Sequence, residues 1–144
     1  MRSGVLLDTG PLVAYLNERD AHHDWTVEAF SELDPPVITC EPVLSEACFL
    51  IERNRQPGAL VLDFALESEF QVGLQLGGEL AAVRALMQRY VNVPMSLADA
   101  CLVRLAELTA LPICTLDGDF AIYRAHGRRP LQLIAPERRH LHEP

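Results

Sequence analysis

The sequence predicts an α/β fold with three layers, α/β/α, in which helices cover both faces of a mostly parallel central sheet of about five strands. Short apolar runs bounded by turn residues alternate along the chain with segments of helical periodicity, as parallel sheets with helical crossovers require. No linker is long enough to split the chain, and 144 residues suit one domain. We therefore expect a single domain over residues 1–136, followed by a C-terminal tail over residues 137–144.

The expected strands are apolar runs that are continuous or alternate with period two. They lie near residues 4–8, 36–40, 70–75, 112–116 and 131–134. Turn-forming segments interrupt the apolar pattern between elements. These segments are Pro35-Pro36, Gln56-Pro57-Gly58, Gly77-Gly78 and Arg128-Arg129-Pro130.

Helical periodicity fills the segments between the strands. Residues 11–18 begin with Pro11, which suits the first position of a helix. Residues 22–33 and 42–54 each place apolar side chains on one face: Trp25, Ala29, Phe30 and Leu33 in the first, and Val43, Ala47, Leu50 and Ile51 in the second. Further helices are expected over residues 57–67, 78–90 and 96–109, with a short one over 119–125.

Composition indicates a soluble cytoplasmic protein without a membrane span. Hydrophobic residues make up 49% of the chain, yet Asp8 interrupts the first apolar run, and no run could cross a bilayer. The four cysteines form no CxxC pair and are expected in the core as free thiols. The net charge of −8 is uneven: residues 1–120 carry 7 Arg and 18 acids, and residues 121–144 carry 5 Arg and 2 acids.

Two acids directly follow predicted strands. Asp8 comes after Val5-Leu6-Leu7, and Asp117 comes after Ile113-Cys114-Thr115-Leu116. Because sites in open parallel sheets form beyond the carboxyl ends of the strands, both acids are expected at the same edge. Two more acids, Glu46 and Asp99, lie in apolar stretches of predicted helices, where a carboxylate is costly unless it is solvated or paired.

Each acid also has a purely structural interpretation. Asp99 matches a capping pattern with Ser96, and Asp8 and Asp117 could cap the helices that follow them. Asp119 is the better cap candidate for the last helix. Glu46 could pair with Arg53 or Arg84. Four such coincidences at one sheet edge are less probable together than one shared site. Converging carboxylates repel one another unless a cation compensates them, and Mg²⁺ and Mn²⁺ prefer oxygen ligands.

At these acids the sequence resembles the PIN-domain family, and in particular the VapC-like toxin ribonucleases of bacterial VapBC toxin–antitoxin pairs. The matching pieces cover nearly the whole chain in order. They are the stretches at 5–13 (VLLDTGPLV), 43–47 (VLSEA), 96–100 (SLADA) and 115–120 (TLDGDF).

The resemblance implies that Asp8, Glu46, Asp99 and Asp117 are the catalytic, metal-coordinating acids, with Asp119 as a supporting ligand. Thr9 and Thr115 would orient carboxylates or metal-bound water. It also implies one or two Mg²⁺ or Mn²⁺ ions, an RNA substrate cut by hydrolysis, a cognate antitoxin and a homodimer.

Three other interpretations stay open: a housekeeping PIN nuclease, a non-catalytic PIN-like binding scaffold, and a phosphoacceptor domain, which ranks low because the chain has no lysine. An aspartic protease is rejected despite Asp8-Thr9-Gly10, because helix follows the motif and those enzymes are all-β. The C-terminal arginines are either solvated or contact RNA or an acidic partner. Arg128 and Arg129 are the candidates, with Arg138 and Arg139 beyond them.

Overall fold

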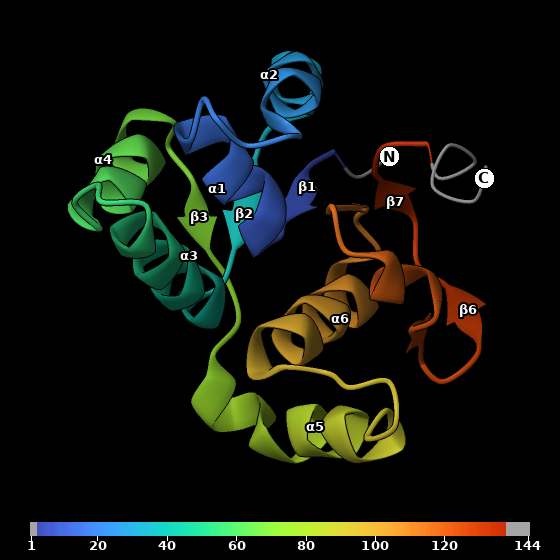
Figure 1. Ribbon diagram of the computed structural model, residues 1–144. Coiled ribbons are helices and arrows are strands. Elements are labelled where there is room, and N and C mark those ends of the chain that lie inside the picture. The colour runs from blue at the N-terminus through green and yellow to red at the C-terminus, as the bar shows by residue number, and fades with distance from the viewer. Residues whose placement is uncertain (1–2, 138–144) are drawn as a thin grey trace.

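The computed structural model describes residues 3–137 and contains a five-stranded sheet in which every neighbouring pair is parallel. The strands are β1 (Val5–Leu7), β2 (Val37–Thr39), β3 (Gln71–Val72), β4 (Ile113–Cys114) and β7 (Leu133–Ile134). Their order in the sheet is β3-β2-β1-β4-β7 (Figure 1). All five predicted strands are therefore present. Arg138, Arg139 and nearly all of the predicted tail lie outside the described residues.

The helices fall into two groups, as Figure 1 shows. The first comprises α1 (Thr9–Leu16), α2 (His23–Ser31), α3 (Glu41–Arg53) and α4 (Ala59–Glu67), and the second comprises α5 (Leu76–Arg89) and α6 (Leu97–Thr109). The chain moves outward from β1 to β3 and then returns past β1 to β4. Because crossovers between parallel strands are right-handed, this reversal places the second group on the opposite face of the sheet.

The reversal also creates a switch point between β1 and β4. Leu6 lies opposite Ile113 and Leu7 opposite Cys114, so the two strands end side by side. In open parallel sheets the crevice beyond the carboxyl ends of such strands is where ligands bind. Residues that directly follow β1 and β4 therefore lie together at this edge of the sheet.

The core holds the sheet edge rigid from both sides. Val5, Leu6 and Leu7 of β1 are at most 1% exposed, because helices cover both faces of this central strand. On the second face, α6 is buried almost all round, with Cys101, Leu102 and Val103 fully inaccessible to solvent. Burial of this apolar surface, at about 25 cal/mol per Å², is the main term that stabilises the position of β1 and α6.

A small hairpin follows β4 where the sequence predicted a helix over residues 119–125. A 3-10 helix, η1 (Gly118–Ala121), is followed by β5 (Arg124–Ala125) and the antiparallel β6 (Arg129–Pro130). The helix stops because the Arg124 N–H donates to the Tyr90 hydroxyl, 2.9 Å away, and because His126 and Gly127 have positive φ and reverse the chain.

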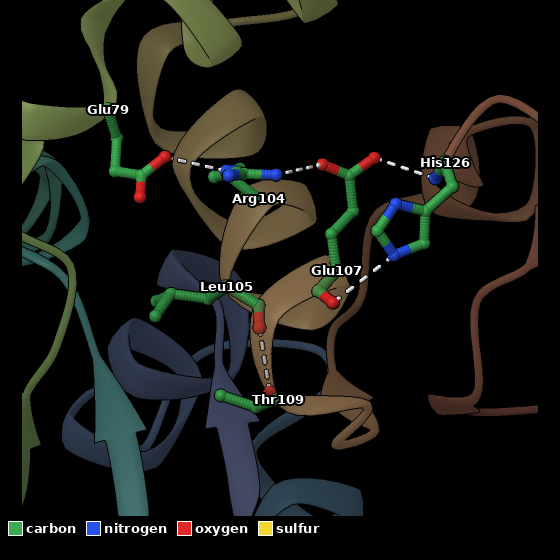
Figure 2. A network of polar contacts seen from close by, with 6 residues as sticks. All are labelled: Glu79, Arg104, Leu105, Glu107, Thr109 and His126. Carbon is green, nitrogen blue, oxygen red and sulfur yellow. Dashed lines mark hydrogen bonds and ion pairs between the residues drawn. The ribbon is translucent and has the colours of Figure 1, made fainter.

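A polar network attaches this hairpin and α5 to α6 (Figure 2). The Arg104 guanidinium contacts Glu79 on α5 at 2.7 Å and Glu107 on α6 at 3.1 Å. Glu107 in turn accepts a 2.7 Å hydrogen bond from the backbone N–H of His126. Both carboxylates raise the pKa of Arg104, so the guanidinium stays charged and the connection is permanent at physiological pH.

Within residues 3–137, no helix is long and apolar enough to span a membrane. The four cysteines are free, and Cys40, Cys101 and Cys114 are buried, as the sequence predicted.

Candidate functional site

Asp8 lies at the switch point, immediately after β1. Its N–H donates to the carbonyl of Cys114 at 3.1 Å and so extends the ladder between β1 and β4 by one residue. The carboxylate is only 5% exposed. One of its oxygens accepts the Thr9 N–H at 2.8 Å and the other accepts the Thr115 hydroxyl at 2.6 Å. Asp8 therefore caps α1, as the structural interpretation predicted, and both of its carboxylate oxygens accept hydrogen bonds at the end of β1.

Within residues 3–137, Asp8 forms no ion pair with a cationic side chain. Arg104 of α6 pairs instead with Glu79 and Glu107. The pKa of Asp8 is raised from 3.8 to about 7: burial is the largest cause and the charges of Asp99 and Asp117 add to it, whereas the hydrogen bonds from Thr115 and Thr9 oppose it. A buried carboxyl in this state gains from a proton or a bound cation.

Thr115 joins the ends of β1 and β4. While its hydroxyl donates to Asp8, the same oxygen accepts the N–H of Asp117 at 2.9 Å. Asp117 then accepts the N–H of Asp119 at 2.9 Å and caps η1. The prediction that Asp119 would be the better cap of this element is wrong, because the residue before the helix, Asp117, has the extended backbone that a cap requires.

Asp99 opens α6 on the other side of the crevice. It forms a reciprocal capping box with Ser96: the Ser96 N–H donates to Asp99 at 3.0 Å, and the Asp99 N–H donates to the Ser96 hydroxyl at 3.1 Å. The structural interpretation of this acid is thus confirmed. Partial burial raises the pKa of Asp99, the Ser96 hydrogen bonds lower it, and the charges of Asp117 and Glu46 raise it. Asp99 therefore caps α6 within the same electrostatic cluster as Asp8 and Asp117.

Glu46 is the most exposed of the predicted acids and lies on α3. The proposed ion pair with Arg53 or Arg84 is wrong for the described residues. The guanidinium of Arg53 lies over the ring of Phe49, four residues earlier in α3. Arg84 donates a hydrogen bond to Gln88, four residues later in α5. The carboxylate of Glu46 instead acts electrostatically on Asp99 across the crevice.

Tyr123 is a site residue that the sequence analysis did not single out. Its side chain is fully buried, and its hydroxyl donates to the carbonyl of Pro94 at 3.0 Å. Burial, followed by the charges of Asp99, Asp119 and Asp117, raises the pKa of Tyr123 and keeps the phenol neutral. The available signal was the spacing of Phe120 and Tyr123, whose rings pack edge to face and support the segment that carries Asp117 and Asp119.

The carboxylate oxygens of these acids are the ligand type that a small hard cation prefers, although those of Asp8, Asp99 and Asp117 each accept a hydrogen bond from a nearby backbone N–H. Across residues 3–137, no group of three His, Cys, Asp or Glu side chains is arranged to hold a metal ion. Asp99 and Asp117 point to backbone N–H groups, but each carboxylate keeps free lone pairs for a metal. Beside Asp8, the Thr9 hydroxyl oxygen is buried without a hydrogen-bond partner, a position suited to contact with a metal-bound water.

Comparison with known proteins agrees with this architecture. The PIN domain family model matches residues 5–125. The crystal structure of Mycobacterium tuberculosis VapC20, described as a toxin that cleaves the sarcin–ricin loop, superposes with a TM-score of 0.77 at 21% sequence identity, covering 88% of this chain and 99% of VapC20. No curated protein matches the sequence. The family match spans β1 to β5 and includes every predicted acid, and the chain therefore belongs to the PIN domain family.

Proposed function

We propose that this chain is a divalent-metal-dependent endoribonuclease that hydrolyses RNA phosphodiester bonds and serves as the toxin of a toxin–antitoxin pair. The observation that carries the proposal is the buried, cation-free Asp8 at the switch point, within the electrostatic influence of Asp99 and Asp117. Membership of the PIN domain family supports the reaction class, and the likeness to VapC20, a toxin that cleaves the sarcin–ricin loop, supports the toxin role.

Asp8, Glu46, Asp99 and Asp117 would hold one or two Mg²⁺ or Mn²⁺ ions, with Asp119 as a further ligand. When bound, such an ion supplies a hydroxide-like nucleophile and stabilises charge on a phosphoryl oxygen. The acidic site then becomes locally able to accept a polyanion.

The threonines organise this site. Thr115 holds the Asp8 carboxylate in one orientation and connects it to Asp117, so the two acids keep their relative position. Thr9 has a buried hydroxyl without a hydrogen-bond partner beside Asp8, and this hydroxyl would be available to a water of the bound ion. Tyr123 is neutral and its hydroxyl donates to the carbonyl of Pro94, so its ring packs beside the acids without adding charge.

The decisive experiment measures cleavage of a labelled oligoribonucleotide by the purified chain with Mn²⁺, with Mg²⁺ and with EDTA. We expect metal-dependent endonucleolytic products from the wild type and none from Asp8→Asn or Asp99→Asn. The matched control is Asp63→Asn, which removes an exposed carboxylate from α4. Undiminished cleavage by an Asp8→Asn, Asp99→Asn double variant would refute the assignment.

The biological role needs a separate measurement, because a housekeeping nuclease would have the same chemistry. A toxin should arrest growth when expressed alone, and coexpression of the neighbouring gene's product, the cognate antitoxin, should relieve the arrest. Cytoplasmic location and a homodimer belong to the same proposal. Sedimentation of the purified chain tests the second of these.

A further inference from the structure

Phe49 on α3 is an exposed aromatic side chain that packing does not explain. It is 58% exposed and lines a hollow of about 620 Å³, a volume within the usual range of ligand sites. The other walls come from the start of α3, the start of α6 and the segment that leads into α5. They are mainly apolar and are formed by Pro42, Leu74, Leu76, Leu97 and Ala98.

The hollow borders the candidate metal site at Glu46. Glu46, one of the proposed metal ligands, lines it, as does Ser96, the capping partner of Asp99. A ligand that binds the acids through one of its groups can therefore place the adjacent group in the hollow. In an RNA strand bound by its phosphate at the metal, the neighbouring group is a nucleobase.

Along α3, a metal-binding acid, an aromatic ring and a cation follow one another, which matches the phosphate, base and next phosphate of a nucleotide strand. Glu46, Phe49 and Arg53 are spaced by three and four residues, so they share one face of the helix. The Arg53 guanidinium lies 5.8 Å from the centre of the Phe49 ring, is exposed, and has no carboxylate partner among the described residues. An unpaired cation roughly 10 Å along the helix from Glu46 suits a second phosphate.

The polar atoms inside the hollow also suit a base edge. Glu41 and Ser45 line it and can accept hydrogen bonds from exocyclic amino groups. The flat apolar wall of Phe49 suits the face of a base, since unpaired bases stack on aromatic side chains in single-stranded RNA recognition. A hydrophobic peptide would use the apolar walls alone and would leave the guanidinium of Arg53 without a role.

We propose that this hollow is a nucleobase-binding subsite for single-stranded RNA, in which Phe49 stacks on a base next to the scissile phosphate and Arg53 contacts the following phosphate. The inference rests on the proposed ribonuclease function and specifies its substrate as unpaired RNA. Phe49 and Arg53 then determine substrate affinity and position and take no part in the hydrolysis itself.

The test compares Phe49→Ala, Phe49→Trp and Arg53→Ala with the wild type on an unstructured oligoribonucleotide. Steady-state cleavage with Mn²⁺ gives KM and kcat, and fluorescence anisotropy of the same oligonucleotide with Ca²⁺ gives Kd and its salt dependence. The controls are Leu66→Ala, which shortens a 78% exposed apolar side chain on α4, and Arg19→Ala, which removes an exposed cation beyond the C-terminal end of α1.

We expect Phe49→Ala to raise KM and Kd by about 5- to 160-fold with a much smaller change in kcat, because stacking contributes about 1–3 kcal/mol per base. Phe49→Trp should restore binding. Arg53→Ala should reduce the slope of log Kd against log salt by about 1. The two control variants should behave as the wild type does.

Wild-type KM and Kd in both Phe49→Ala and Arg53→Ala overturn the subsite while leaving the ribonuclease intact. If KM and Kd for RNA are unchanged but the variants no longer bind a protein partner, the hollow belongs to that partner, and the RNA assignment is equally overturned. A wild type that neither cleaves nor binds RNA removes the proposed function first, so the two failures are distinguishable.

Discussion

Replacing Asp8 by Asn should stabilise the metal-free protein. Asp8 is 5% exposed and has no cation beside it, so folding moves its charge from water into a buried position. Asn matches the neutral carboxyl in shape. Its oxygen can accept the Thr9 N–H, and its amide can donate to the Thr115 hydroxyl oxygen, which retains a lone pair beyond the one that Asp117 uses.

The size of the effect follows from the pKa of Asp8, which is 3.8 before and about 7 after folding. As the pH rises, Asp8 ionises in the unfolded chain at a lower pH than in the folded protein. The free energy of unfolding therefore falls between about pH 4 and about pH 7 and is constant above that range. Titration of Asp8 therefore costs up to about 2 kcal/mol at pH 5, where the carboxyl is protonated in the folded protein and ionised in the unfolded chain. At pH 8, where it is ionised in both states, the cost is about 4 kcal/mol. Water entry around the charge reduces this cost, so we expect Asn to gain about 1–4 kcal/mol at pH 8.

Urea unfolding in EDTA at pH 5 and pH 8 measures the gain for Asp8→Asn, with the exposed Asp63→Asn as the matched control. The stabilisation should be larger at pH 8 than at pH 5 for Asp8→Asn and near zero at both for the control. An Asp8→Asn protein no more stable than the wild type at pH 8, or a difference that does not change with pH, would refute the account of this carboxyl.

Three further predictions concern the same chain. Mn²⁺ or Mg²⁺ should raise the wild-type melting temperature, because an ion that binds only the folded state at a hundredfold excess over Kd stabilises it by about 2.7 kcal/mol. A melting temperature that does not change in calorimetry at millimolar metal contradicts the site. Thr115→Val should cost about 1–3 kcal/mol in urea unfolding and reduce cleavage, because Asp8 and the Asp117 N–H both lose a partner, whereas Thr115→Ser should retain both. Removing the exposed Arg128 and Arg129 of the β5–β6 hairpin together should weaken RNA binding and lower its salt slope by about 2, and unchanged anisotropy titrations would mean that these side chains are merely solvated.

Much of the fold could be predicted from the sequence because strand position and helix period are local properties. Five apolar runs between turn residues predicted β1, β2, β3, β4 and β7, and all five are strands. The helix expected over residues 119–125 failed for a non-local reason. The hydroxyl of Tyr90, more than thirty residues away, takes the N–H of Arg124 and stabilises a strand there.

The identities of the acids were likewise available from the chain, since Asp8 and Asp117 each follow an apolar strand. Their physical state was not. The hydrogen bond between Thr115 and Asp8 joins residues 107 positions apart, and the influence of Tyr123, Asp99 and Glu46 on the cluster arises only when α3, α6 and η1 meet at the sheet edge. Sequence therefore determined which side chains carry chemistry here, because apolar patterning sets where strands end. Tertiary structure decided how deeply each charge is buried and which partner it faces, because burial and long-range hydrogen bonds depend on packing between segments that no local pattern encodes.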